Sequence, residues 1–113
     1  MSHPEIGSLV RAKDQMIDNL KKEDYVMALR DMRAISIDIK KNDMNQSLFT
    51  KIMKEENQAR GTESSRQYRR HLASSAHTYW NWAHDLIQIL WDKGYLADKK
   101  YKEVPEGGGF DTG

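Results

Sequence analysis

Basic and imidazole side chains recur along one stretch of this sequence, where together they could bind phosphate. Arg66, Arg70, His77 and His84 fall within roughly 40° of one another when the stretch is drawn as an α-helix. Arg69 lies close by, and guanidinium and imidazole donors suit phosphate oxygens. We therefore expect Arg66, Arg69, Arg70 and His77 to be the candidate contacts to nucleic acid or phosphate.

The preceding stretch both extends and weakens this basic strip. Lys51, Lys54 and Arg60 add positive charges on its side, whereas nearby glutamates, among them Glu55 and Glu56, oppose them. The whole chain has 18 Lys or Arg against 17 Asp or Glu, a net charge of +1. Such a balance predicts no general attraction to nucleic acid or to a membrane, so that only a local patch could bind phosphates.

Two spacings of Arg and His in this stretch resemble a catalytic motif. Arg66 and His71 form R-x4-H, and Arg70 and His77 form R-x6-H. The pattern resembles the motif of the HEPN family, small all-α proteins whose ribonuclease members use an Arg and a His near the start of a late helix, usually across a dimer. On a continuous helix Arg66 and His71 lie about 140° apart, whereas Arg70 and His77 share a face. The resemblance implies a HEPN-like ribonuclease or RNA-binding bundle, with His77 as acid or base and Arg70 on the phosphate.

Aromatic residues suggest a different class of function. Trp80, Trp82, Trp91 and Tyr95 follow the basic strip within a short length of chain. Such side chains combine a large apolar body with a polar group and are enriched where proteins meet. They favour a non-enzymatic interaction or assembly module, regulatory or structural, that forms a homo-oligomer or binds a protein partner. The ribonuclease is the alternative.

Metal and cofactor sites are not expected. The chain has no cysteine, which excludes thiolate ligands, a thiol nucleophile and disulfides. His77 and His84 are two helical turns apart, and no E-x-x-H pair of the di-iron type accompanies them.

One long helix, Thr62 to Lys93, is expected to hold all these candidate residues. Thr62 follows the breaker Gly61 as a possible N-cap, and Lys93-Gly94-Tyr95 fits a Schellman stop. Its length would be roughly 45 to 50 Å, and its apolar arc about 200°, so it should be covered on two sides. The apolar stripe comprises Tyr68, Leu72, Ala76, Tyr79, Ala83, Leu86 and Leu90.

Three shorter helices should precede it. The capping-box spacing of Ser2 and Glu5 and the apolar spacing after it predict a helix that runs to about Lys21. A second helix should run from an N-cap at Asp24 through Lys41 and form an antiparallel hairpin with the first. A third helix follows Asn42, and its polar end, residues 54–60, is expected to fray or lie on the surface. The fold class predicted is all-α, a four-helix bundle over residues 1–97. Its aromatic end is expected to project past the third helix.

Residues 98–113 are rich first in Lys and then in Gly, a composition that predicts a flexible tail. The first residues lack the basic and apolar segments of a signal peptide, and no apolar run approaches a membrane span. We expect one cytoplasmic domain with no membrane contact.

Overall fold

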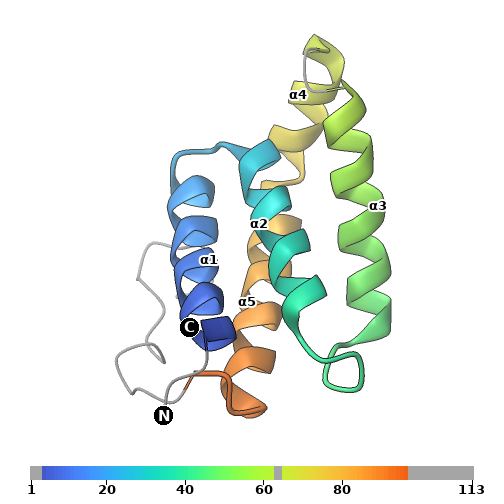
Figure 1. Ribbon diagram of the computed structural model, residues 1–113. Coiled ribbons are helices and arrows are strands. Elements are labelled where there is room, and N and C mark those ends of the chain that lie inside the picture. Colours follow the sequence, from blue (N-terminus) through green and yellow to red (C-terminus); the bar gives the residue numbers. More distant parts are fainter. Residues whose placement is uncertain (1–3, 63–64, 97–113) are drawn as a thin grey trace.

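The computed structural model describes residues 4–62 and 65–96, which form five α-helices and no strand. In chain order they are α1 (Pro4–Lys21), α2 (Tyr25–Asp38), α3 (Gln46–Thr62), α4 (Arg66–Ser74) and α5 (Ala76–Asp92), labelled in Figure 1. The all-α class is confirmed, and the expected number of four helices is wrong. The predicted tail, residues 98–113, lies outside the described residues. None of the described helices combines the length and the apolar character needed to cross a membrane.

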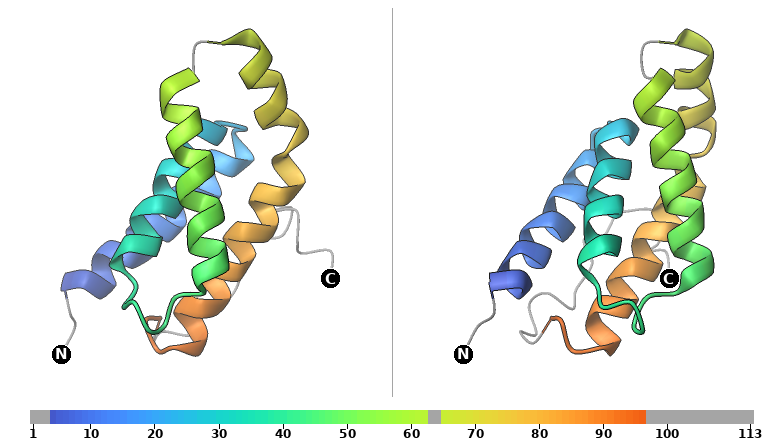
Figure 2. Two further views of the ribbon diagram at one scale, coloured as in Figure 1. Left: turned by 90° about the vertical axis from the view of Figure 1, so that its right-hand side faces the viewer. Right: turned by 45° about the vertical axis from the view of Figure 1, so that its right-hand side comes forward.

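The first two helices form the antiparallel hairpin that the sequence predicts (Figures 1 and 2). Asp24 caps α2, because its side chain accepts a hydrogen bond of 3.3 Å from the Met27 backbone N–H. In the turn before it, Glu23 takes a left-handed conformation with φ of 63°. α2 then contacts each of the other four helices, so it is the central element of the fold.

The predicted single helix over residues 62–93 is wrong, because it is broken at Ser75 into α4 and α5. Ser75 leaves the helical conformation with φ −97° and ψ 7°, while the Ser74 hydroxyl donates to the His71 carbonyl at 2.9 Å. Adjacent serines offer the backbone competing hydrogen bonds, which favours a kink. The predicted cap at Thr62 is also wrong: Thr62 ends α3, and Ser65 caps α4 by accepting from the Tyr68 N–H at 3.2 Å.

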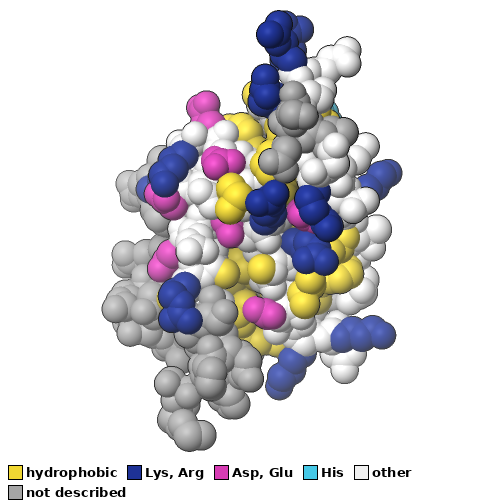
Figure 3. All heavy atoms as spheres, turned by 45° about the horizontal axis from the view of Figure 1, so that its top comes forward, with side chains coloured by type: hydrophobic (Ala, Val, Ile, Leu, Met, Phe, Trp, Pro, Cys, Tyr) yellow, Lys and Arg dark blue, Asp and Glu magenta, His cyan; other side chains and the backbone are white. Residues whose placement is uncertain are grey.

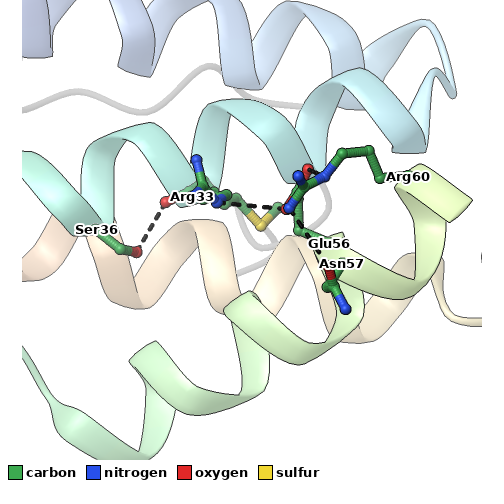
Figure 4. A network of polar contacts seen from close by, with 6 residues as sticks. Arg33, Ser36, Glu56, Asn57 and Arg60 are labelled. Carbon is green, nitrogen blue, oxygen red and sulfur yellow. Dashed lines mark hydrogen bonds and ion pairs between the residues drawn. The ribbon is translucent and has the colours of Figure 1, made fainter.

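The polar end of α3 is a regular helix, so residues 54–60 do not fray. Lys54, Asn57, Gln58 and Arg60 do lie on the surface, as the other half of the expectation had it, whereas Glu56 and Ala59 are buried. Glu56 is only 3% exposed, and Arg60 holds its carboxylate with bonds of 2.9 and 3.1 Å. Arg33 of α2 adds an ion pair of 3.4 Å, and Figure 4 shows the two arginines converging on the carboxylate. The pairing lets a charged residue be buried between α2 and α3, and the polar turn stays helical in consequence.

The end of α5 is the Schellman stop predicted at Gly94, which has φ of 84°. The Tyr95 N–H donates to the Leu90 carbonyl at 2.8 Å, and the Gly94 N–H donates to that of Trp91 at 3.3 Å. The Tyr95 hydroxyl then donates to Asp43 at 3.0 Å and accepts from the Lys40 backbone N–H at 2.9 Å. These bonds tie the end of α5 to the α2–α3 connection. Figure 2 shows that this end extends past the start of α3, as expected. Its burial by a second copy or by a partner stays a prediction.

Candidate functional site: a basic and aromatic groove

An open groove of about 490 Å³ lies where α3, α4 and α5 meet. We call it the Trp82 groove. It is lined by Lys51, Lys54, Glu55 and Gln58 of α3, by Tyr68 and His71 of α4, and by Trp82 of α5. Every lining side chain is charged, polar or aromatic, and none is aliphatic. The groove is therefore suited to a ligand with charge and flat rings more than to a purely apolar one.

The sequence places the α3 side of the groove on one face of that helix. Its four lining residues follow the spacing i, i+3, i+4, i+7, which is the spacing of neighbours along a helical face. Lys51 and Lys54 are exposed, and Glu55 is half-buried. Tyr68 and Trp82, which also line the groove, belong to two different helices because the break at Ser75 separates α4 from α5.

Glu55, which lines the groove, joins the three helices through hydrogen bonds. Its Oε2 accepts a hydrogen bond of 2.5 Å from the Tyr79 hydroxyl and lies 2.8 Å from His71 Nε2. The Tyr68 hydroxyl donates to the Glu55 backbone carbonyl at 3.4 Å. Only 16% of the Glu55 side chain is exposed, so most of this carboxylate faces protein donors and not solvent.

Ring contacts fix the aromatic side chains around this carboxylate. The rings of Tyr68 and His71 are 5.3 Å apart with a tilt of 42°, and those of Tyr79 and Trp82 are 5.5 Å apart with a tilt of 54°. Both distances are in the range of favourable tilted aromatic pairs. Trp82 thus rests on a fully buried tyrosine, while part of its own surface stays open to the groove.

The two tyrosines that face Glu55 are held in their neutral form. Burial, reinforced by the charge of Glu55 and a hydrogen bond to it, raises the pKa of Tyr68 to about 12. Burial is also the largest cause of the raised pKa of Tyr79, followed by its hydrogen bond to Glu55. Loss of a proton would place a second negative charge beside the half-buried carboxylate of Glu55. Both phenols therefore act as fixed hydrogen-bond donors that hold the rings in place.

The predicted phosphate contacts lie outside this groove. Arg66, Arg69 and Arg70 are exposed on α4, and His77 is exposed on α5. The alignment predicted for Arg70 and His77 assumed one continuous helix, and the break at Ser75 separates them. No hydrogen bond joins Arg70 to His77 in the part of the chain that the structure describes. Catalysis by this pair, and phosphate binding by the four residues, stay predictions.

The predicted partner-binding residues are all half-buried. Trp80, Trp82, Trp91 and Tyr95 pack against the edge of the core and are neither fully buried nor fully exposed. Of these four, Trp82 is the one that lines the groove, while Tyr95 is hydrogen-bonded to the α2–α3 connection. Their role in binding a partner stays a prediction.

Sequence reasoning missed the cluster around Glu55. It treated Glu55 only as a charge that weakens the basic strip, and it paired His71 with Arg66. The polar stripe from Lys51 to Gln58 was the available signal, because a polar stripe at helical spacing beside an apolar one can face another helix. Within residues 4–62 and 65–96, no group of three or more His, Asp or Glu side chains is arranged to hold a metal ion.

No protein-family model matches this chain, and comparisons with curated proteins and with solved structures find no significant match.

Proposed function

We propose that this chain is a small non-enzymatic helical interaction or assembly module that acts through the aromatic side of α5. The observation that carries the proposal is the position of Trp82. The core face of α5 is made by Tyr79, Ala83, Leu86, Ile87 and Leu90. The tryptophan stands beside this face, in an open groove built by three helices.

The energetics of such a side chain support binding. A tryptophan left partly in water still offers apolar surface, which gains about 25 cal/mol for each Å² covered by a partner. Tryptophan, tyrosine and arginine are also the residues that most often dominate binding energies at interfaces. The Trp82 groove presents the first two, and Lys51 and Lys54 flank them with positive charge. A partner that covers this groove would bury rings and pair charges at once.

The test is the solution mass of the purified chain by light scattering, with absorbance at 260 and 280 nm recorded on the same peak. We expect a mass above the 13.2 kDa of one chain, from self-association or from a retained partner. Trp82→Ala should return the mass to that of one chain while the helical circular dichroism is kept. Ile37→Ala is the matched control, because Ile37 is 51% exposed on α2 and does not line the groove.

Two results would overturn the proposal. One is a wild-type chain that, purified at low salt and kept at high concentration, stays a monomer and retains no partner on the peak. The other is a larger assembly that Ile37→Ala disrupts and Trp82→Ala leaves intact, since the binding surface would then lie on α2.

A further inference from the structure

We propose that the partner bound in the Trp82 groove is a single-stranded nucleic acid, whose bases stack on the groove's rings while its phosphates meet the lysines. The inference rests on the proposed function, because it takes the groove to be a binding surface. It adds the chemical class of the partner.

The composition of the groove lining is the first reason. Trp82 and Tyr68 are its only large apolar side chains, and both are flat rings. A protein segment that anchors through Leu, Ile or Val would find no aliphatic side chain in this groove, only the two rings. A second hollow in the same molecule does have aliphatic side chains: it is lined by Ile37, Ile39, Met44 and Phe49, among others. Stacking of nucleobases on aromatic rings needs only the flat faces that the Trp82 groove provides.

The distribution of charge is the second reason. Residues 51–74 hold six Lys or Arg against three Glu, a net charge of +3, while the whole chain has +1. Positive charge is therefore concentrated at the end of the molecule formed by α3 and α4. Figure 3 looks toward this end and shows several Lys and Arg side chains close together near the centre, with other basic and acidic side chains spread over the face. Such a field attracts a polyanion locally although the chain as a whole is almost neutral.

Two of the three glutamates in residues 51–74 have hydrogen-bond or ion-pair partners in the structure. Glu56 is buried between Arg33 and Arg60, and Glu55 directs its carboxylate to Tyr79 and His71. The positive charges of Lys51 and Lys54 are exposed at the groove. A phosphate in the groove can therefore pair with two exposed lysines, whereas only 16% of the Glu55 side chain and 4% of the Glu56 side chain are exposed to repel it.

The geometry favours single strands over duplexes. In a duplex the bases are already stacked on one another, so their faces cannot reach the side chains of a groove. In a single strand the faces are free, and a groove with cations along one wall and rings along the other can follow the backbone while it stacks bases. Because stacking accepts any base, we expect weak dependence on base sequence and similar affinity for RNA and DNA.

The experiment is fluorescence anisotropy with labelled oligonucleotides of about twelve nucleotides, as single-stranded RNA, single-stranded DNA and duplex DNA. The wild-type chain should bind both single strands, more weakly at higher salt, and the duplex at least several-fold less tightly. Trp82→Ala should weaken binding by about 10-fold or more, the loss expected for one stacking ring, and Trp82→Phe should retain most of the affinity.

A charge-matched pair of variants tests the lysines. Lys51→Gln with Lys54→Gln should lower the affinity and reduce the slope of log affinity against log salt by about 1.4, which corresponds to two phosphate contacts. Lys40→Gln with Lys41→Gln removes the same charge from exposed positions in the α2–α3 connection. It should leave the slope within error of the wild type.

Each contrary outcome separates this inference from the proposed function. No binding of single strands at low salt, together with an assembly that Trp82→Ala dissolves, refutes a nucleic-acid partner and leaves a protein partner for the groove. Binding that Trp82→Ala and the Lys51, Lys54 double variant both leave unchanged places the nucleic acid elsewhere. Equal binding of the duplex refutes stacking.

Discussion

The buried carboxylate of Glu56 provides a sharp test of how α2 and α3 are held together. Its side chain is 4% exposed, whereas those of Arg33 and Arg60 are 43% and 50% exposed. Removing the arginines one at a time leaves the carboxylate one cation. Removing both arginines leaves the buried carboxylate without a cation, so the loss of stability in the double variant should exceed the sum of the losses in the two single variants.

The magnitudes follow from the contacts. Arg33→Met loses one long ion pair of 3.4 Å and should lower the free energy of unfolding by about 0.5 kcal/mol. Arg60→Met loses two bonds to the carboxylate and should cost about 1.5 kcal/mol. The double variant should cost about 3 to 5 kcal/mol, the range for an uncompensated buried charge. The excess over the sum is then about 1 to 3 kcal/mol, as found for residues in one network.

A triple variant shows whether the loss of stability comes from the unpaired charge of Glu56. Adding Glu56→Met to the double variant removes the stranded charge and fills its place with an apolar chain. This substitution should recover most of the lost free energy, because an apolar trio of similar volume replaces a buried ion network at little or no cost.

Urea unfolding followed by far-ultraviolet circular dichroism measures these differences, provided that the denaturant slope stays constant across the variants. Arg11→Met serves as the control, since Arg11 is exposed on α1, and should change stability by less than about 0.5 kcal/mol. Additive losses in the double variant, or a triple variant no more stable than the double, would refute the reasoning and indicate that water reaches Glu56.

Two further perturbations test the end of α5 and the floor of the groove. Gly94→Ala should destabilise the fold by about 1 to 2 kcal/mol, because Gly94 has φ of 84° and a residue with a Cβ is strained there. The added Cβ would meet no other atom within 4 Å, so the cost is that of the backbone alone. An unchanged urea midpoint would contradict this prediction. The chain should lose stability as the pH rises from about 10 to about 12. Tyrosines of the unfolded chain ionise near pH 10, whereas the pKa of Tyr68 in the folded chain is about 12. Between these values the unfolded chain binds fewer protons than the folded one, so rising pH favours unfolding. Tyr68→Phe should flatten this part of a plot of thermal midpoint against pH, and an equally steep fall in that variant would assign the loss to other groups.

Local patterns in the sequence predicted the elements whose signals lie within a few residues. Apolar spacing predicted the α1–α2 hairpin, and Asp24 and Gly94 were correctly predicted as the cap and the stop. These features depend on side chains that bond to their own backbone or on a glycine that accepts a positive φ, and both are local properties.

Local patterns gave the wrong prediction where a side chain of one helix is bound by a side chain of another. Residues 54–60 appeared too polar to pack, yet Glu56 is buried because Arg33 reaches it from α2. The pair Ser74-Ser75 is a local signal for a kink. The apolar stripe continues on both sides of this pair, and for that reason a single unbroken helix was predicted.

The composition and spacing of this chain determined by themselves that it is all-α and that its tryptophans and basic residues concentrate toward its second half. Only the tertiary structure decided which of those residues meet. It brings His71 of α4 and Tyr79 of α5 to one carboxylate oxygen of Glu55 on α3. It also opens a groove beside Trp82. The physical reason is that helical periodicity reports which face of an element is apolar, while the partner of a polar side chain depends on how that element is turned against its neighbours.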